Sequence, residues 1–156
     1  MIDISIPGFG DLSLTHLVLD FNGTLAADGG LLPGVAPRLA RLAQELQVHV
    51  LTADTFGKVR KEMAGLPVSV TIIPRGEEAQ AKADFVRGLG ARHTAAVGNG
   101  RNDALMLKEA ALGVAVVQQE GAAVATLTAA DLVTPDILAA LDLFLHPTRL
   151  IASLRA

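Results

Sequence analysis

The sequence contains no cysteine, tryptophan or tyrosine, and aromatic residues make up only 3% of the chain. Without cysteine the chain has no disulfide, no thiol nucleophile and no cysteine-ligated metal centre. Charged residues are also scarce, at 19%, whereas an average chain has about 25%. We interpret the low charge as a sign that part of the surface is covered, and we expect a homo-oligomer. A general bias toward Leu and Ala would give the same composition.

The sequence also lacks an excess of positive charge and a long apolar run. Its 13 Lys and Arg residues and 16 Asp and Glu residues give a net charge of −3. Domains that bind nucleic acid usually carry a basic surface, so we expect no nucleic-acid partner. No segment approaches the roughly 20 apolar residues of a membrane span, and an acid at Asp3 argues against a signal peptide. We therefore expect a soluble, cytoplasmic protein with no membrane partner.

The order of the apolar segments predicts an α/β fold. The segments 1–6 and 12–17 flank a Pro/Gly turn and are typical of an N-terminal β-hairpin. Alternating strands and helices then predict a Rossmann-like parallel sheet with helices on both faces. The expected strands are 16–20, 48–52, 67–73, 93–98, 112–117 and 131–134; the expected helices are 35–46, 55–64, 77–89, 103–110, 122–127, 135–145 and 148–155.

We expect the whole chain, 1–156, to form one domain. The connections between the expected strands and helices are short. Neither the loop 23–34 nor the stretch 56–78 is long enough to hold a second domain. The site of this protein should therefore have no cap domain over it.

Polar residues follow three of the expected strands where each strand ends. Asp20 ends the first and is followed by Phe-Asn-Gly-Thr, Thr52 ends the second, and Asn-Gly-Arg-Asn-Asp at 99–103 follows the fourth. Ligands of an open α/β sheet bind at the carboxyl ends of the strands. Lys82 lies one strand–helix unit before the last group. Each feature alone is typical of a helix cap, a turn or a solvated side chain, but their joint occurrence in this order indicates a functional site.

Together these motifs resemble the haloacid dehalogenase (HAD) superfamily of phosphatases and phosphotransferases over essentially the whole chain. Within it, the chain is most similar to the phosphorylation domain of P-type ATPases, whose later motif also ends in Asn-Asp. The resemblance implies a HAD core fold, an aspartyl phosphate on Asp20 and Mg²⁺ as cofactor. It implies catalytic roles for Asp20, Asn22, Thr52 and Lys82, phosphate binding by Gly23, Thr24, Thr52, Ala53 and Lys82, and Mg²⁺ ligation by Asp20, Asn22, Asn99 and Asp103.

The residue types fit these roles. A carboxylate can accept a phosphoryl group covalently, and a neighbouring Mg²⁺ and lysine favour its ionised form. Backbone N–H groups near Gly23 and Thr24 can reach a phosphate from the turn. Asp103 can either bind the metal or orient Lys82. The four histidines, at positions 16, 49, 93 and 146, lack metal-ligand spacing, and we interpret them as structural.

Two asparagines depart from the family pattern. HAD phosphatases usually have Asp two residues after the nucleophile, and Asn22 cannot exchange a proton at neutral pH; general acid–base help is typically worth about 10²–10⁴-fold. Asn99 stands where the family usually has the first acid of its metal motif, so Mg²⁺ binding should be weaker. We expect a slow Mg²⁺-dependent phosphatase or phosphotransferase with a phosphorylated substrate. A catalytically silent phosphate- or metal-binding module that works through partners, and a scaffold that keeps only the fold, are the alternatives.

The C-terminal segment 137–156 is dense in Leu and Ile. We expect Leu143, Phe144 and Leu154 to face outward and to be buried between subunits, because exposed apolar patches of this size are unusual on monomers. The alternative is that this segment folds back over the N-terminal hairpin. A neighbouring subunit would also provide a cover for a site that has no cap domain.

Overall fold

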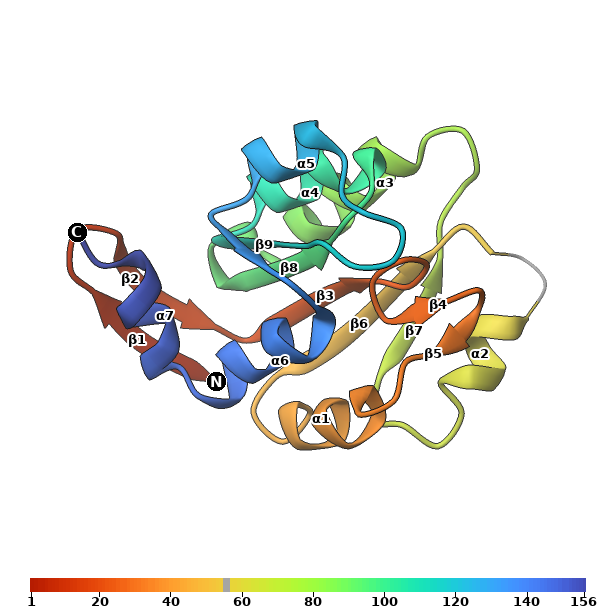
Figure 1. Ribbon diagram of the computed structural model, residues 1–156, viewed down its shortest axis with the longest axis horizontal. Helices are drawn as coiled ribbons and strands as arrows, with labels where there is room; N and C mark the ends of the chain where they lie inside the picture. Colours follow the sequence, from red (N-terminus) through yellow and green to blue (C-terminus); the bar gives the residue numbers. More distant parts are fainter. Residues whose placement is uncertain (55–56) are drawn as a thin grey trace.

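The computed structural model describes residues 1–54 and 57–156, and its main feature is a six-stranded parallel sheet (Figure 1). The strand order is β10-β9-β8-β3-β6-β7, and helices connect consecutive strands along the chain. The expected α/β, Rossmann-like fold is confirmed. The strands are β3 (His16–Asp20), β6 (Gln47–Thr52), β7 (Ser69–Ile72), β8 (Thr94–Gly98), β9 (Leu112–Val116) and β10 (Leu132–Thr134).

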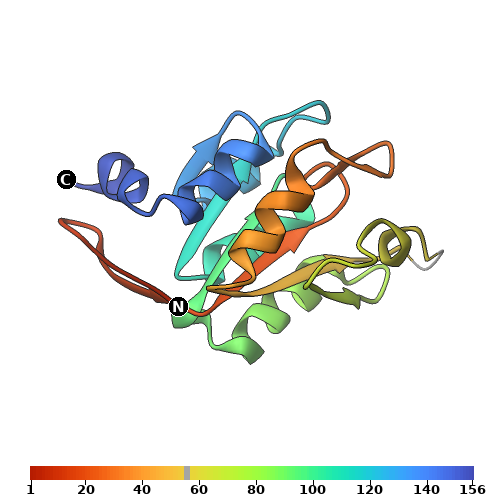
Figure 2. The ribbon, with the colours of Figure 1, turned by 90° about the horizontal axis from the view of Figure 1, so that it is seen from below.

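Helices cover both faces of this sheet (Figure 2). One face carries α1 (Val35–Leu42) and α6 (Ile137–Leu145), and the other carries α3 (Glu78–Leu89), α4 (Ala104–Glu109) and α5 (Val124–Ala129). Side chains of a strand alternate between the two faces. In β3, Leu17 and Leu19 accordingly pack in the apolar cluster under α1 and α6, and Val18 packs in the cluster under α3 and α4. Burial on both faces explains why β3 is apolar from Leu17 until it ends at Asp20.

The N-terminal hairpin is confirmed as a separate antiparallel pair, β1 (Ile2–Ile6) and β2 (Gly10–Leu14). The last helix, α7 (Thr148–Leu154), packs beside β1. The N–H of Ala156 donates to the carbonyl of Pro7 at 2.9 Å. The hairpin therefore serves as the surface on which the end of the chain packs, as Figure 1 shows.

The expected outward orientation of the C-terminal apolar residues is wrong. Leu143 and Phe144 are only 7% and 2% exposed, and Leu154 is half-buried against the same apolar cluster. The physical reason is that α6 packs against the sheet and α1 while α7 closes over the hairpin, so both apolar sides of the segment meet the chain's own core. The alternative, a tail that folds back over the hairpin, is confirmed.

The shorter elements differ in detail from those expected. The loop 23–34 contains a small flap, formed by β4 (Ala26–Ala27) and β5 (Gly30–Leu31). These two strands were not expected, because two residues are too few for a periodic pattern. The helix expected at 55–64 appears as α2 (Lys58–Glu62), and its expected first residues, 55–56, lie outside the described part of the chain. The helix expected from 135 begins at Ile137, because the carboxylate of Asp136 caps it by accepting from the N–H of Ala139 at 2.7 Å.

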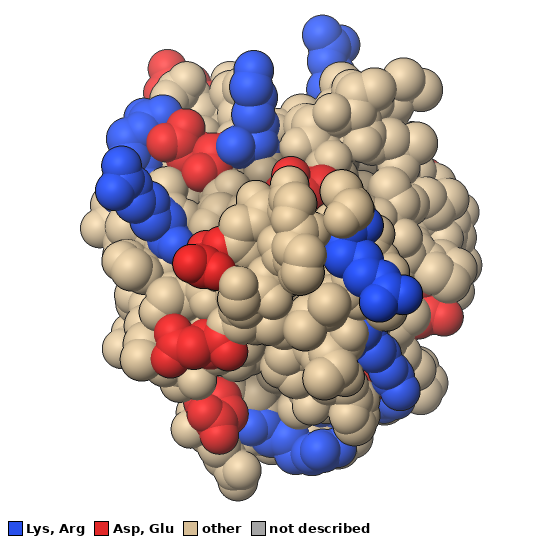
Figure 3. All heavy atoms as spheres, turned by 90° about the vertical axis from the view of Figure 1, so that its left-hand side faces the viewer, with Lys and Arg blue, Asp and Glu red and all other residues tan. Residues whose placement is uncertain are grey.

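No helix of the described residues is able to cross a membrane by itself. The face drawn in Figure 3 carries charges of both signs. Within residues 1–54 and 57–156, no single helix is long and apolar enough to cross a membrane. The two consecutive helices α6 and α7 reach that length and hydropathy only together, with a bend of 112° between them. On the face drawn in Figure 3, acidic and basic side chains lie among large uncharged areas.

Candidate active site

Three strand ends meet in a cavity of about 580 Å³ at the carboxyl edge of the sheet. Asp20 ends β3, Thr52 ends the neighbouring strand β6, and Asn99 follows β8 on the other side of β3. Because parallel strands end at one edge, these three side chains line one cavity although they lie far apart in the sequence. Three further predicted residues line it as well: Asn22, Ala53 and Lys82.

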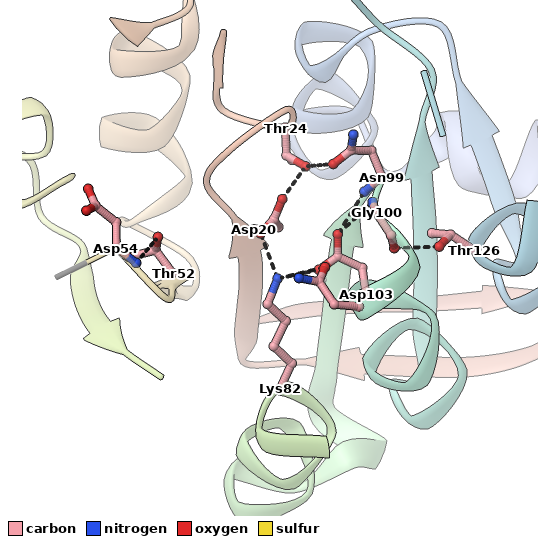
Figure 4. Close-up of polar contacts among 10 residues, drawn as sticks. Asp20, Thr24, Thr52, Asp54, Lys82, Asn99, Gly100, Asp103 and Thr126 are labelled. Carbon is pink, nitrogen blue, oxygen red and sulfur yellow. Dashed lines mark hydrogen bonds and ion pairs between the residues drawn. The ribbon is translucent and has the colours of Figure 1, made fainter. Parts of the chain in front are cut away.

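Lys82 joins two carboxylates at the base of this cavity (Figure 4). Its Nζ atom lies 2.7 Å from Oδ1 of Asp20 and 2.7 Å from Oδ1 of Asp103. The lysine side chain is 2% exposed and that of Asp103 is fully buried. Buried charges are tolerated when they are paired and hydrogen-bonded. The lysine therefore holds Asp20 and Asp103 together out of bulk water.

Lys82, Asp20 and Asp103 together carry excess negative charge when both carboxylates are ionised. Burial, followed by the charge of Asp103, raises the pKa of Asp20 to about 7, although Lys82 and Thr24 oppose this shift. Burial alone lowers the pKa of Lys82, but the two carboxylates outweigh it, so the pKa of Lys82 is raised. One ammonium group cannot balance two carboxylates, and a further cation at the site would favour the ionised form of Asp20.

Asp103 is fully engaged by the protein. Its Oδ2 atom accepts the N–H groups of Asn99 at 3.0 Å and of Gly100 at 2.9 Å, while Oδ1 receives Lys82. It packs so closely on Gly98 that a Cβ there would lie 2.5 Å from Asp103 Cγ. Of the two roles considered for Asp103, these contacts support the orientation of Lys82. Its role as a metal ligand stays a prediction.

Two oxygen atoms converge on the hydroxyl group of Thr24. The Oγ1 atom lies 3.1 Å from Oδ2 of Asp20 and 3.2 Å from Oδ1 of Asn99. Carboxylate and amide oxygens are ligands that Mg²⁺ accepts. Among residues 1–54 and 57–156, however, no three His, Cys, Asp or Glu side chains are arranged to hold a metal ion. Asp20 also accepts from Lys82 and Thr24, but it lines the cavity, whereas Asp103 is fully buried. Of the two predicted carboxylate ligands, Asp20 is therefore the one that faces the cavity.

The turn after β3 differs from the expectation. The N–H groups of Gly23 and Thr24, expected to reach a phosphate, donate within the turn to the carbonyls of Ala26 at 2.9 Å and Phe21 at 3.3 Å. The carbonyls of Gly23 and Thr24 accept from Nε2 of Gln118 at 3.1 and 2.9 Å. Gln118 was not predicted, and it ties the turn to the loop that follows β9.

The opposite side of the cavity offers donors for phosphoryl oxygens. Thr52 accepts the N–H of Asp54 at 3.1 Å, so the hydroxyl proton of Thr52 can be donated to a ligand. Several lining residues were missed in the sequence, although most of them lie shortly after a strand end, where the same edge rule could have found them. They are Asp54, Arg75, Glu78, Gly100, Asn102 and Glu120.

Solved structures share this arrangement of the chain. The 3-deoxy-D-manno-octulosonate 8-phosphate phosphatase of Moraxella catarrhalis, solved with magnesium, phosphate and KDO, has a TM-score of 0.73 at 17% identity, over 89% of this chain and 90% of that one. A proposed HAD-family hydrolase of Streptomyces avermitilis has a TM-score of 0.68 at 22% identity, over 87% of both chains. The chain has the fold of the haloacid dehalogenase (HAD) superfamily. A zinc-transporting PIB-type ATPase in its E2·Pi state matches this HAD fold with a TM-score of 0.63 at 25% identity, over 78% of this chain and 20% of the ATPase.

Two archaeal proteins are similar in sequence, whereas no protein-family model matches the chain. The uncharacterized protein MJ0073 of Methanocaldococcus jannaschii is 50% identical over 60 residues, which are 38% of this chain and 64% of that protein. The uncharacterized protein MJ0072 of the same organism is 44% identical over 39 residues, 25% of this chain and 89% of that protein. This HAD-fold chain belongs to the same family as MJ0072, and its match spans less than two thirds of MJ0073.

Proposed function

We propose that this chain is a Mg²⁺-dependent phosphatase or phosphotransferase that forms an aspartyl phosphate on Asp20. The observation that supports this most is the position of the Asp20 carboxylate, which is held 2.7 Å from Lys82 where three strand ends open into one cavity. A site built only to bind phosphate would place no carboxylate at its centre, because two anions repel each other. A carboxylate, in contrast, can serve both as the phosphoryl acceptor and as a ligand of Mg²⁺.

The residues of the cavity divide the reaction between them. An oxygen of Asp20 attacks phosphorus, so that a bond from Asp20 to phosphorus forms and the bond to the leaving oxygen breaks. Lys82 balances the negative charge of the carboxylate and the phosphoryl group. The hydroxyl group of Thr52 donates a hydrogen bond to a phosphoryl oxygen. The oxygen of a water molecule then attacks phosphorus and the bond from phosphorus to Asp20 breaks, which releases phosphate with the protons of that water and regenerates the carboxylate. The amide of Asn22 is not acidic enough to donate a proton near neutral pH, so the leaving oxygen takes its proton from water, and turnover is slow.

The residues present fit Mg²⁺ as the cofactor. The converging oxygens of Asp20 and Asn99 are hard donors of the kind that Mg²⁺ prefers. The backbone carbonyl of Asn22 is the third ligand that we propose. When bound, Mg²⁺ supplies positive charge that offsets the negative charge of the phosphoryl group.

Incubation with acetyl phosphate and Mg²⁺, followed by intact-mass measurement, tests the proposed function. We expect the wild type to gain one phosphoryl group, and we expect no gain in Asp20→Asn or in the wild type with EDTA. A wild type that gains no phosphoryl group would contradict the proposal. It would favour the alternative of a catalytically silent module that binds phosphate, metal or a partner.

We propose a phosphorylated substrate that is covered from outside this chain. The loop 23–34 carries only the short flap β4–β5, and no other insertion near the cavity forms a cap within the described ranges. A neighbouring copy in a homo-oligomer would provide such a cover. Light scattering tests this prediction, and a mass of one chain, 16.2 kDa, would contradict it.

A further inference from the structure

Glu120, in the loop after β9, lines the same cavity as Asp20 and Asn99. Its carboxylate lies against the turn at Gly23, where a Cβ atom would be 2.5 Å from Glu120 Oε2 and 2.7 Å from Asn99 Nδ2. Gly23 also has φ +77°, a conformation that favours glycine. The turn therefore leaves open the space in which the carboxylate of Glu120 and the amide of Asn99 approach each other.

Hydrogen bonds hold the loop that carries Glu120 on both sides of this residue. Before it, Gln118 donates to the carbonyls of Gly23 and Thr24. After it, the carbonyl of Gly121 accepts from Nδ2 of Asn99 at 3.1 Å. The side chain of Glu120 is exposed, but these hydrogen bonds hold its backbone at the rim of the cavity.

The predicted metal ligands leave this rim short of negative charge. Asn99 offers an uncharged oxygen, and Asp103 is occupied by Lys82 and two N–H groups. Asp20 would then be the one carboxylate on a divalent cation. Loss of a negative charge beside a divalent cation weakens the electrostatic attraction that holds the cation, although water screens part of the effect.

We propose that Glu120 supplies the second carboxylate for the Mg²⁺ ion, in place of the charge that Asn99 lacks. This inference rests on the Mg²⁺ site of the proposed function. A Cβ atom at Gly23 would also lie 3.1 Å from Asn99 Oδ1, so the carboxylate of Glu120 and the amide oxygen of Asn99 border the same space. This arrangement favours a role of Glu120 at the metal over a role as the proton donor that Asn22 cannot be. The cavity thus obtains its second acid from the loop after β9 instead of from the motif after β8.

Calorimetric titration of the metal-free protein with Mg²⁺ tests this assignment. We expect Glu120→Gln to weaken Mg²⁺ binding by about 10- to 100-fold, the range seen when supporting groups of a metal site are lost. The matched control is Glu77→Gln, an exposed acid outside the cavity, which should bind Mg²⁺ as the wild type does. Adding Asn99→Asp to Glu120→Gln should restore affinity, because it returns a carboxylate to the same rim.

Any other result of this Mg²⁺ titration would overturn the assignment of Glu120 as a ligand. Unchanged Mg²⁺ affinity in Glu120→Gln would do so, whether or not hydrolysis falls, and a fall in hydrolysis alone would point to proton transfer. An equal loss in Glu77→Gln would show an effect of overall charge. Phosphorylation by acetyl phosphate at saturating Mg²⁺ reports separately on the proposed function: if the wild type binds Mg²⁺ through Glu120 but is never phosphorylated, only the proposed function fails. A wild type that binds no Mg²⁺ would overturn both.

Discussion

Lys82 and Asp20 form a buried ion pair in which Nζ lies 2.7 Å from Oδ1, and the same Nζ is shared with Asp103. Lys82→Met would leave two carboxylates facing each other in a buried site. Removal of one partner of a buried pair typically costs about 3–5 kcal/mol. We expect a loss of this order in the free energy of unfolding at a pH well above 7, measured by urea denaturation. The loss should shrink at acidic pH, where the carboxylates take up protons.

A matched control for this prediction is Lys108→Met, which removes the same charge from an exposed position on α4. It should leave the free energy of unfolding nearly unchanged. A loss in Lys82→Met that is no larger than in this control would contradict the structural role of the ion pair.

Asp20 should lower the stability of the metal-free protein at high pH. Its folded-state pKa, about 7, is above the ordinary value of 3.8. The group therefore contributes stability that is complete below pH 3.8 and is lost as the pH rises through about 7. We expect Asp20→Asn, measured with EDTA, to melt higher than the wild type above pH 7 and to lose this advantage on acidification. A gain of about 1 kcal/mol corresponds to roughly 2–4 °C, and a lower melting temperature at high pH would contradict the prediction.

Asn22→Asp should accelerate hydrolysis of a generic aryl phosphate by about one to three orders of magnitude, which is within the usual range for a general acid–base. The reason is that Asn22 lines the cavity with Asp20, but its amide is not acidic enough to act as a general acid near neutral pH. Steady-state rates at saturating Mg²⁺ give the measurement. Asn22→Ala is the control and should stay near the wild-type rate. If Asn22→Asp is no faster than this control, the missing acid does not limit turnover.

A pair of histidines at the other end of the sheet should make stability fall in mild acid. His16 Nδ1 lies 3.1 Å from His49 Nε2, and burial together with a neighbouring histidine lowers the pKa of both. The unfolded chain therefore binds more protons below about pH 6.5, and stability falls as the pH drops through this value. His16→Asn should reduce this slope in melting curves recorded against pH. His146→Asn, at an exposed position, should keep it, and an equal slope in both variants would contradict the prediction.

The sequence allowed the sheet and the core of the site to be predicted, because both depend on local patterns. A buried strand is apolar on both faces, so β3 was recognisable, and its end marked Asp20. The sequence places Glu120 and Gln118 after an expected strand, but it does not show what they contact. The approach of Glu120 to Asn99 and the hydrogen bonds of Gln118 arise from β9 lying beside β8 and from the glycine at 23, which are tertiary relationships.

The C-terminal helices show a different limit. The pattern of Leu and Ile in 137–156 indicates which residues are apolar, but it does not say what covers them. Leu143 and Phe144 were expected at a subunit interface, and they are buried within the chain itself. Helical periodicity gives the faces of a helix, whereas the identity of the covering element depends on how the hairpin and α7 pack.

Borohydride trapping is the most direct test of the central claim, that Asp20 is the phosphoryl acceptor. Borohydride reduces an acyl phosphate to an alcohol, so a phosphorylated aspartate becomes homoserine, which peptide mass spectrometry can locate. After reaction with acetyl phosphate and Mg²⁺, we predict homoserine at position 20 and at no other acidic residue, and none in Asp20→Asn. Homoserine at another position, or its absence from a wild type that binds Mg²⁺, would contradict the account.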